Sequence, residues 1–547
     1  MATPQFLGAS SPATLPPVTG AAAPAVIPLR RRLGAGALKD GPEPKAAPPI
    51  GATPAPPPFT VTTSWTALTF ANASGAPPDV SIAVGPLHVV ETINTAMAAY
   101  DKLGNLVFGP VSLDTFFATA PFSGFDPKVM YDAESGRFFV VLIGVDDATN
   151  RGRAWVAASQ TSDPAGLWNK YLLVEEEGAF PDYPGFGFTS DKVTVAANRF
   201  SLPNPVFIGS EVFVIRKADL IAGVVPPNVT HFLPHSAYFA PQPAESQTPT
   251  LDQFMIAVDT FSFDSVHFLT VSGEPGVTAV TMNDTVLVSN TGSFPPLARQ
   301  PGARDIDAGD DRFQRAVWRN GSLWAAATGA CTPPGDVAPR SCPRLMEIST
   351  VGAPTVLQDF AYGEAGFDSY YAAPMTDSLG NLAVVFSRSS VSEFAGVRFA
   401  GRLVTDSANT ASSSALLKAG ERSYDCTFCG ELNRWGDYSG AAVDPVDGSL
   451  WVAGEYAGLP TSDDYKTFIA RLVLSTPPTT SSTTSSTTSS TTSSTTSSTT
   501  SSTTSSTTSS TTSSTTSSTT SSTTSSTTTT PPPRGTGWPN LIVEWTA

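Results

Sequence analysis

The sequence predicts an all-β fold, a seven-bladed β-propeller, from three observations. An Asp that opens a short apolar run recurs seven times at intervals of about 60 residues, which is typical of a repeat architecture. Each copy continues with a turn and a second apolar strand. Alternating runs of Val, Phe, Thr and Tyr, bounded by Gly, Asp, Asn and Pro, recur throughout, whereas no long stretch has a helical period. One four-stranded sheet per copy gives seven blades.

The repeats are defined by their first residue. These residues are Asp79, Asp126, Asp182, Asp252, Asp311, Asp368 and Asp437. If each copy starts at the innermost strand of its blade, all seven carboxylates surround one mouth of the central channel. The alternative is that each Asp caps a turn by accepting hydrogen bonds from nearby backbone N–H groups.

The turns between the first two strands of a copy are the clearest local signals. Residues 132–136 and 444–448 each run from an Asp to a Gly, and Asn320-Gly321 is the dipeptide of a two-residue hairpin. The last copy has room for about three strands, and residues 59–70 form a strand without a repeat of its own. We therefore expect residues 59–70 to share a sheet with residues 465–474, which would close the ring and leave no free edge between its two ends.

Composition divides the 547 residues into four segments. Residues 1–59 are a Pro/Ala-rich arm, expected to be disordered, and residues 60–474 have the composition of a globular domain. Residues 475–533 are a Ser/Thr/Pro-rich stalk, also expected to be disordered, and either glycosylated or inert. Residues 534–547 are too few for a domain, and a docking strand, a truncated module and a recognition tail all stay open.

Charge and hydropathy exclude several partners. The net charge is −16, from 31 basic and 47 acidic residues, which argues against nucleic-acid binding. No stretch of 18 apolar residues is present, so no membrane span is expected. The first residues lack the basic start and apolar core of a signal peptide. An upstream start, another export route and an internal location stay open; we favour the first, and expect a monomeric protein outside the cell or on its surface.

The four cysteines form two local pairs. Cys331 and Cys342 flank a loop inside one repeat, and Cys426 and Cys429 form a Cys-x-x-Cys just before the last Asp. Two loop disulfides in an oxidising compartment are favoured. A Cys₄ zinc site or a redox motif is the alternative, but the first pair is widely spaced and the second lies in a loop of an all-β chain.

Two groups of residues could bind ligands. The first is the Asp ring with the aromatic residues beside it, Tyr183, Tyr370, Trp435 and Tyr438, because a sugar site needs stacking faces next to carboxylates. Core packing between blades would use the same aromatic residues. The second group is Asp305, Asp307 and Asp310, whose alternate carboxylates resemble part of a calcium loop. A turn with Asp–Arg ion pairs is the alternative.

Two segments carry a family resemblance. Residues 132–141 and 434–445 resemble a group of secreted bacterial propeller proteins, which is similar to the sialidase-like superfamily with Asp boxes. Asp447, Gly448 and Trp451 keep the Asp, Gly and Trp of that box with altered spacing. The resemblance covers about residues 60–474 and implies the propeller fold. It assigns no arginine triad, and true sialidases usually have six blades.

These observations favour a non-catalytic binding module outside the cell, with a glycan, a protein or a cation-bridged ligand at the Asp-lined mouth. No cofactor is assigned, calcium being the one candidate, and no catalytic residue is assigned. The alternative is an extracellular glycoside hydrolase that uses a pair of ring carboxylates. A second alternative is a structural envelope protein.

Overall fold

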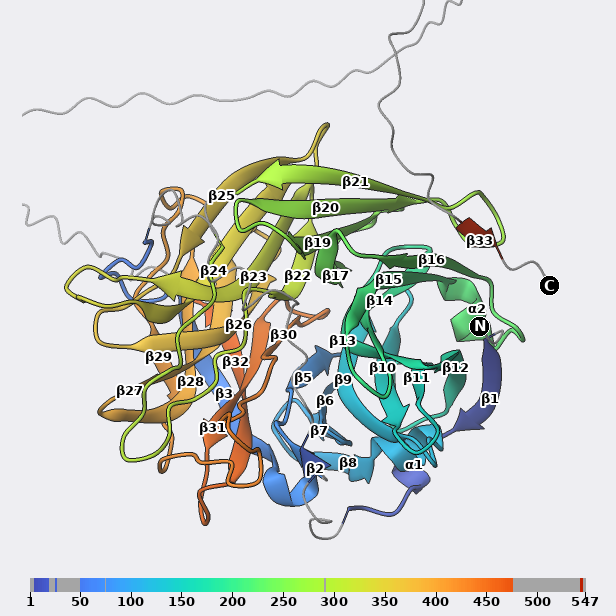
Figure 1. Cartoon of the computed structure of the whole chain (residues 1–547), viewed down its shortest axis with the longest axis horizontal. Helices are drawn as coiled ribbons and strands as arrows, with labels where there is room; N and C mark the ends of the chain where they lie inside the picture. Colours follow the sequence, from blue (N-terminus) through green and yellow to red (C-terminus); the bar gives the residue numbers. More distant parts are fainter. Residues whose placement is uncertain are drawn as a thin grey trace, which may run out of the picture. The chain divides into compact units, whose positions relative to one another are not determined.

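The computed structural model describes residues 4–18, 25–26, 50–73, 75–289, 292–475 and 542–544. These residues belong to one compact unit, whose regular structure is almost entirely β-strand (Figure 1). Two short α-helices, α1 (Leu113–Phe117) and α2 (Lys217–Ala222), are the exceptions among the described residues, together with the 3₁₀ turns Pro12–Thr14 and Phe70–Asn72. The all-β prediction is confirmed, and the fold is a β-propeller.

Five sheets have the size of a propeller blade. In spatial order their strands are β5 (Ser81–Val84), β6 (His88–Ile93), β7 (Ala96–Asp101), β8 (Leu106–Ser112); β1 (Gln5–Ser10), β12 (Trp168–Glu177), β11 (Arg151–Ser159), β10 (Arg137–Asp146), β9 (Ser123–Asp132); β17 (Tyr238–Pro243), β19 (Gln253–Asp259), β20 (Ser265–Ser272), β21 (Thr281–Val288); β26 (Asp368–Thr376), β27 (Leu382–Ser390), β28 (Glu393–Arg402), β29 (Ala415–Lys418); and β3 (Phe59–Thr69), β32 (Tyr465–Leu474), β31 (Leu450–Ala457), β30 (Gly440–Val443). A small parallel pair joins β2 (Ala25–Val26) to β4 (Gly75–Ala76).

A sixth large sheet has ten strands, which corrects the prediction of seven separate blades. In spatial order it contains β25 (Thr355–Ala361), β24 (Arg340–Ser349), β23 (Ser322–Cys331), β22 (Phe313–Arg319), β18 (Glu245–Ser246), β13 (Ala179–Phe188), β14 (Lys192–Ser201), β15 (Phe207–Arg216), β16 (Val229–His235) and β33 (Ile542–Glu544). The short β18 runs parallel to both β13 and β22 and so bonds two antiparallel four-stranded groups into one sheet. Such a bridge between blades has no signal in the repeat pattern.

The innermost strands of the sheets form a closed ring. In order they are β5, β9, β13, β17, β22, β26 and β30; each contacts the next, and β30 contacts β5 (Figure 1). The residues that start or end these strands are therefore brought to the same centre from distant parts of the chain.

A repeated backbone irregularity shapes this centre. Four innermost strands contain a register shift at a residue with positive φ: Asp126 in β9, Tyr183 in β13, Ala240 in β17 and Tyr371 in β26. A β-bulge of this kind re-aims side chains, and a left-handed non-glycine residue is a strained conformation often found at functional sites. The bulge, rather than the Asp, is therefore the feature that these strands share.

The ring closes as expected. The strand β3 pairs antiparallel with β32, with Phe59 opposite Leu474 and Trp65 opposite Ile469. The predicted association of residues 59–70 with residues 465–474 is confirmed. The indole ring of Trp65 also contacts the rings of Tyr100 and Trp451 at 5.7 Å, which ties the first and last sheets together.

Part of the N-terminal arm is ordered, which corrects the expectation of disorder for that part. The strand β1 pairs with β12, and the ring of Phe6 lies 5.2 Å from that of Tyr171. The alternation of residues 5–10 lets one short strand cover the outer edge of a blade, which a composition-based argument missed. At the other end of the chain, β33 pairs with β16, so the tail includes a docked strand. The predicted stalk, residues 475–533, lies outside the described residues except for Ser475.

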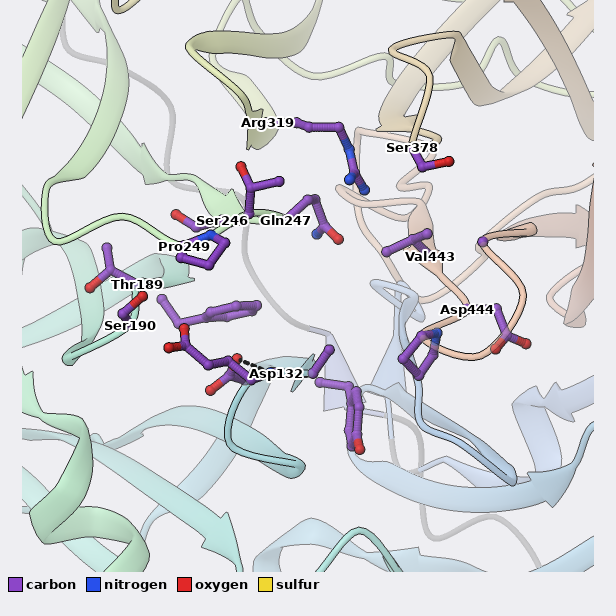
Figure 2. Close-up of a pocket in the computed structure, with 17 residues that line it drawn as sticks. Asp132, Thr189, Ser190, Ser246, Gln247, Pro249, Arg319, Ser378, Val443 and Asp444 are labelled. Carbon is purple, nitrogen blue, oxygen red and sulfur yellow. Dashed lines mark hydrogen bonds between the residues drawn. The ribbon is translucent and has the colours of Figure 1, made fainter. Parts of the chain in front are cut away.

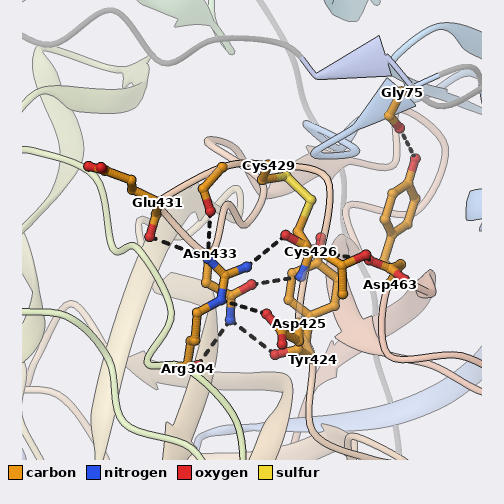
Figure 3. Close-up of a disulfide and its surroundings, with 12 residues drawn as sticks. Gly75, Arg304, Tyr424, Asp425, Cys426, Cys429, Glu431, Asn433 and Asp463 are labelled. Carbon is orange, nitrogen blue, oxygen red and sulfur yellow. Dashed lines mark hydrogen bonds and ion pairs between the residues drawn. A yellow bond between two sulfur atoms is a disulfide. The ribbon is translucent and has the colours of Figure 1, made fainter.

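Both predicted disulfides are present, Cys331–Cys342 and Cys426–Cys429. The second closes a loop before β30 that is fixed from across the sheet by Arg304, which donates to Asp425 and to the carbonyl oxygen of Cys426, each at 2.7 Å (Figure 3). No helix in the described part of the chain is long and apolar enough to cross a membrane.

Candidate functional site

A cluster of buried charged residues lies where the innermost strands meet, and we call Asp79, Asp126, Asp437, Lys128 and Arg434 the central cluster. Asp126 and Lys128 come from β9, Asp79 precedes β5, and the other two precede β30. Asp79, Asp126 and Asp437 are only 0%, 4% and 4% exposed. Three of the seven Asp residues are thus brought together, but as a buried group rather than as the open mouth that the repeat suggested.

Hydrogen bonds connect these carboxylates to one another. Asn94 donates through Nδ2 to Asp79 and accepts through Oδ1 from the backbone N–H of Asp126 at 2.6 Å. The backbone N–H of Asp437 donates to Asp79 Oδ1 at 2.6 Å. Arg434 forms an ion pair with Asp437 at 3.1 Å. These bonds offset part of the free-energy cost of burying the charged groups.

Burial controls the protonation of the cluster. Burial, followed by repulsion from Asp437, raises the pKa of Asp126 to about 6 and raises the pKa of Asp79 well above its usual value. Burial, followed by repulsion from Arg315, lowers the pKa of Lys128 to about 7. Burial thus favours the neutral forms of these carboxyl groups and of Lys128, and carboxyl groups with raised pKa values are what acid–base catalysis uses.

Two of the four aromatic residues expected at the site line the cluster. The rings of Tyr183 and Tyr438 lie 4.8 Å apart, and the ammonium group of Lys128 lies 4.1 Å from the ring centre of Tyr438. The guanidinium group of Arg312 lies 4.4 Å from the ring centre of Tyr183. These cation–π contacts help to stabilise the two buried cations.

The other two aromatic residues pack in the core. Tyr370 and Trp435 are both fully buried. The hydroxyl of Tyr370 lies 3.2 Å from Ser389 Oγ, and Trp435 Nε1 donates to Ser387 Oγ at 2.9 Å. The first interaction joins β26 to β27 within one sheet, and the second joins the segment before β30 to β27. Both have the packing role that the sequence left open.

The remaining four Asp residues of the repeat occupy different environments. Asp368 is buried and binds Arg299 at 2.9 Å, whereas Asp252 lies in the loop before β19 and accepts from Ser272 Oγ at 2.6 Å. Asp182 and Asp311 are buried, the former next to the bulge of β13. The seven Asp residues are therefore not equivalent. The reason is that a period of about 60 residues fixes the blade but not the position within its first strand.

The three residues proposed for calcium are separated by their own contacts. Asp310 forms a buried ion pair with Arg312 at 2.6 Å, and Asp305 is exposed. Asp307 is buried and accepts from the backbone N–H of Gly309. Within the described ranges, no three His, Cys, Asp or Glu side chains are grouped as a metal site requires. Calcium binding stays a prediction.

Space at the central cluster is small. A cavity of about 20 Å³, lined by Lys128, Gln242, Gln314 and Tyr438 among others, lies beside it. This volume suits one water molecule, not a sugar.

A larger pocket lies at the opposite ends of the innermost strands, where they turn into the second strands (Figure 2). We call it the turn-end pocket; its cavity volume is about 470 Å³. Its lining residues are Tyr131, Asp132, Ala133, Glu134, Phe188, Thr189, Ser190, Ser246, Gln247, Thr248, Pro249, Arg319, Ser378, Val443, Asp444, Pro445 and Gly448. The volume lies in the range of small-molecule sites, about 300–1,000 Å³.

The same turns that define the repeat build this pocket. Asp132 accepts from the backbone N–H of Glu134 at 3.1 Å, and Gly136 ends the turn with a φ of 66°. Asn320 and Gly321 both have positive φ, as a two-residue hairpin requires, and place Arg319 at the pocket. The predicted turns are confirmed at these positions.

Sequence reasoning missed this pocket as a site and missed Lys128 in the central cluster, whereas Arg434 was expected as a partner of the Asp ring. Lys128 lies two residues after Asp126, and Arg319 directly precedes the Asn-Gly turn. Both residues lie within the first strand of a repeat copy. A comparison of the polar residues at the start and at the end of each first strand would have identified them as candidates.

The centre and the turn-end pocket both belong to the β-propeller. No family model matches the chain, and no curated protein matches it. Solved structures do match. Trypanosoma rangeli sialidase in complex with the inhibitor DANA has 9% identity and a TM-score of 0.35, over 75% of this chain and 60% of that chain.

Two further structures have similar scores. A Hadza microbial sialidase, Hz136, has 11% identity and a TM-score of 0.34, over 71% of this chain and 74% of that one. The Bacillus subtilis arabinanase Arb43A has 11% identity and a TM-score of 0.27, over 56% of this chain and 98% of that one. At these identities and TM-scores the likeness carries no argument about this chain, so the chemistry of the sites is argued from its own residues.

Proposed function

We propose that the protein is a non-catalytic binding propeller that takes a saccharide in the turn-end pocket. The observation that supports this is a cavity of about 470 Å³ at the ring of innermost strands, lined by hydroxyl, amide and charged groups. Tyr131 and Phe188 add aromatic surface to the lining. Polar groups that converge around an aromatic surface suit the hydroxyls and the apolar faces of a sugar.

The proposed site differs from the mouth that the sequence suggested. The carboxylates of the central cluster are buried, and the cavity beside them holds about one water molecule. The turn-end pocket has the volume that the central cluster lacks.

The proposal includes an extracellular or surface location and a monomeric state. The location is included because two disulfides favour an oxidising compartment. We also propose to count the ten-stranded sheet as two blades, which the ring of innermost strands supports.

The test is binding to a glycan array and titration calorimetry with the best ligands. The variant Ser378→Trp fills the pocket and should lower affinity at least tenfold. Ser407→Trp, on an exposed loop between β28 and β29, is the matched control and should bind as the wild type does. If Ser378→Trp binds every array ligand as tightly as the control, the turn-end pocket is not the site.

A second candidate function is glycoside hydrolysis by the central cluster, which requires the cluster to open to a sugar that its cavity of about 20 Å³ does not admit. The observation that favours it is the proximity of three carboxylates with raised pKa values, which could supply an acid and a base. Chromogenic glycosides should then be turned over by the wild type, and Asp126→Asn should lose that activity while Asp252→Asn keeps it. Turnover that survives Asp126→Asn would exclude this mechanism.

A further inference from the structure

Arg319 is the single Lys or Arg among the described residues that line the turn-end pocket. It is the last residue of β22, and the rigid Asn-Gly turn that follows fixes its direction. Figure 2 shows the side chain extending from β22 into the space between Gln247 and Ser378. Its guanidinium group therefore faces the cavity rather than the surrounding solvent.

The charge of Arg319 has little compensation from the protein. Among the described residues it forms no ion pair, and its printed hydrogen bond, from Nη2 to the carbonyl oxygen of Thr376, is long at 3.4 Å. Its Nε is buried without a hydrogen-bond partner in that part of the chain. Burial lowers the pKa of Arg319, and Asp377 only partly opposes this.

The nearby carboxylate of Asp377 is already occupied. It accepts hydrogen bonds from the backbone N–H groups of Leu379 and Asn381, both at 2.9 Å, and from Asn381 Nδ2 at 2.8 Å. Asp377 thus closes its own turn and leaves the guanidinium group of Arg319 without a bidentate partner.

The acidic residues of the pocket are also paired or exposed. Asp132 forms a buried ion pair with Lys217 at 2.7 Å, and Asp444 forms one with Lys102 at 2.6 Å. Glu134 is exposed at the rim, where solvent screens its charge. The two lysines compensate the charges of Asp132 and Asp444. Arg319 is therefore the dominant uncompensated charge inside the cavity.

Neutral hydrogen-bonding groups lie beside Arg319. Ser246 is only 9% exposed, yet its Oγ has no partner among the described residues. Gln247 also lines the cavity, and Figure 2 places it next to Ser246. A buried hydroxyl without a partner is costly unless a ligand or a water molecule satisfies it.

We propose that the turn-end pocket recognises an acidic saccharide, with its carboxylate bound by Arg319 and its hydroxyls bound by Ser246 and Gln247. This inference rests on the proposed function, that the pocket binds a saccharide, and adds the class of saccharide. A planar guanidinium group matches a carboxylate with two parallel hydrogen bonds, whereas a neutral sugar leaves it unpaired.

The experiment compares matched sugars by titration calorimetry: glucose against glucuronate, and galactose against galacturonate, with acetate as a carboxylate without a sugar. The wild type should bind each acid at least about tenfold more tightly than its neutral partner, as expected for a charged hydrogen bond. Acetate should bind more weakly than either acidic sugar, because it lacks the hydroxyls.

Variants assign the preference to one side chain. Arg319→Gln should bind the neutral and the acidic sugar of a pair equally, with the neutral affinity unchanged, and Arg319→Lys should keep part of the preference. Arg151→Gln, on β11 with a 44% exposed side chain, is the control and should behave as the wild type. Melting curves of all variants verify that they are folded.

Each other outcome overturns the inference. Equal affinity of the wild type for acidic and neutral sugars removes the acidic class and leaves the proposed function intact. A preference that persists in Arg319→Gln assigns the carboxylate to another residue. No binding of any of the four sugars by the folded wild type overturns the inference, whereas the glycan array with Ser378→Trp decides the proposed function separately.

Discussion

Replacing Glu91 by Gln is expected to stabilise the protein at high pH and to leave its stability unchanged at low pH. Glu91 lies in β6, is fully buried, and accepts from the backbone N–H of Leu68 in β3 at 3.2 Å. Its other oxygen is buried without a hydrogen-bond partner among the described residues. Burial raises the pKa of Glu91 from 4.5 to about 7, because no cation compensates the charge.

The pKa gives the size and the sign of the effect. A rise from 4.5 to about 7 corresponds to about 3 kcal/mol of stability. Because the pKa is higher in the folded state, the folded protein holds the proton between these two values and the unfolded chain does not. The free energy of unfolding therefore falls as the pH rises from 4.5 to 7, and an uncharged amide removes that loss.

The assay is urea unfolding at pH 4 and pH 8, extrapolated to water. Glu91→Gln should be more stable than the wild type by about 3 kcal/mol at pH 8 and by less than about 0.5 kcal/mol at pH 4. Glu134→Gln, at an exposed position, is the control and should show no such difference. An equal effect of Glu91→Gln at both pH values, or a loss of stability at pH 8, would refute the reasoning.

Three further changes test the packing of the ring. The double variant Cys331→Ser, Cys342→Ser removes a disulfide that constrains the unfolded chain. It should lower the free energy of unfolding, measured in urea, by about 3 kcal/mol. An unchanged free energy of unfolding would mean that this disulfide does not constrain the unfolded chain. Trp65→Ala should lower the free energy of unfolding by about 3 kcal/mol, because the indole joins the first and last sheets. The control Thr62→Ala, at an exposed position, should lower it by less than about 0.5 kcal/mol. Equal losses in the two variants would contradict this role of Trp65. Phe6→Ala should cost about 1 kcal/mol and speed proteolysis of the N-terminal strand, and an unchanged cleavage rate would argue against docking of that strand on β12.

The class of fold could be predicted from the sequence, because strand periodicity and turn residues are local signals. The turn Asn320-Gly321 and the pairing of residues 59–70 with residues 465–474 follow from turn chemistry and from the need to close a sheet edge. The two disulfides could also be predicted, because the cysteines of each pair are close together in the sequence.

The ten-stranded sheet could not be predicted, because a two-residue strand, β18, joins two four-stranded groups into one sheet. Two residues carry no periodicity, so nothing in the sequence marks this bridge. The strand in the N-terminal arm was missed for a related reason: its six residues stand in a Pro/Ala-rich segment whose average composition hides them.

The site was predicted only in part. Asp79, Asp126 and Asp437 meet in the central cluster because β5 lies between β9 and β30 in the ring, as the repeat implied. Burial decided what the repeat could not: the carboxylates face inward, and the open cavity lies at the other end of the same strands. Whether the ends of an innermost strand are exposed depends on loops from several sheets. The sequence of one repeat unit does not contain those loops.

The most direct test is a crystal structure of the protein with the tightest-binding saccharide from the array. We expect the sugar in the turn-end pocket, with a ligand oxygen within hydrogen-bond distance of Arg319 and another within that distance of Ser246 or Gln247. A saccharide bound at another surface, or beside Asp126 in the central cluster, with the turn-end pocket holding only water, would contradict the proposed function.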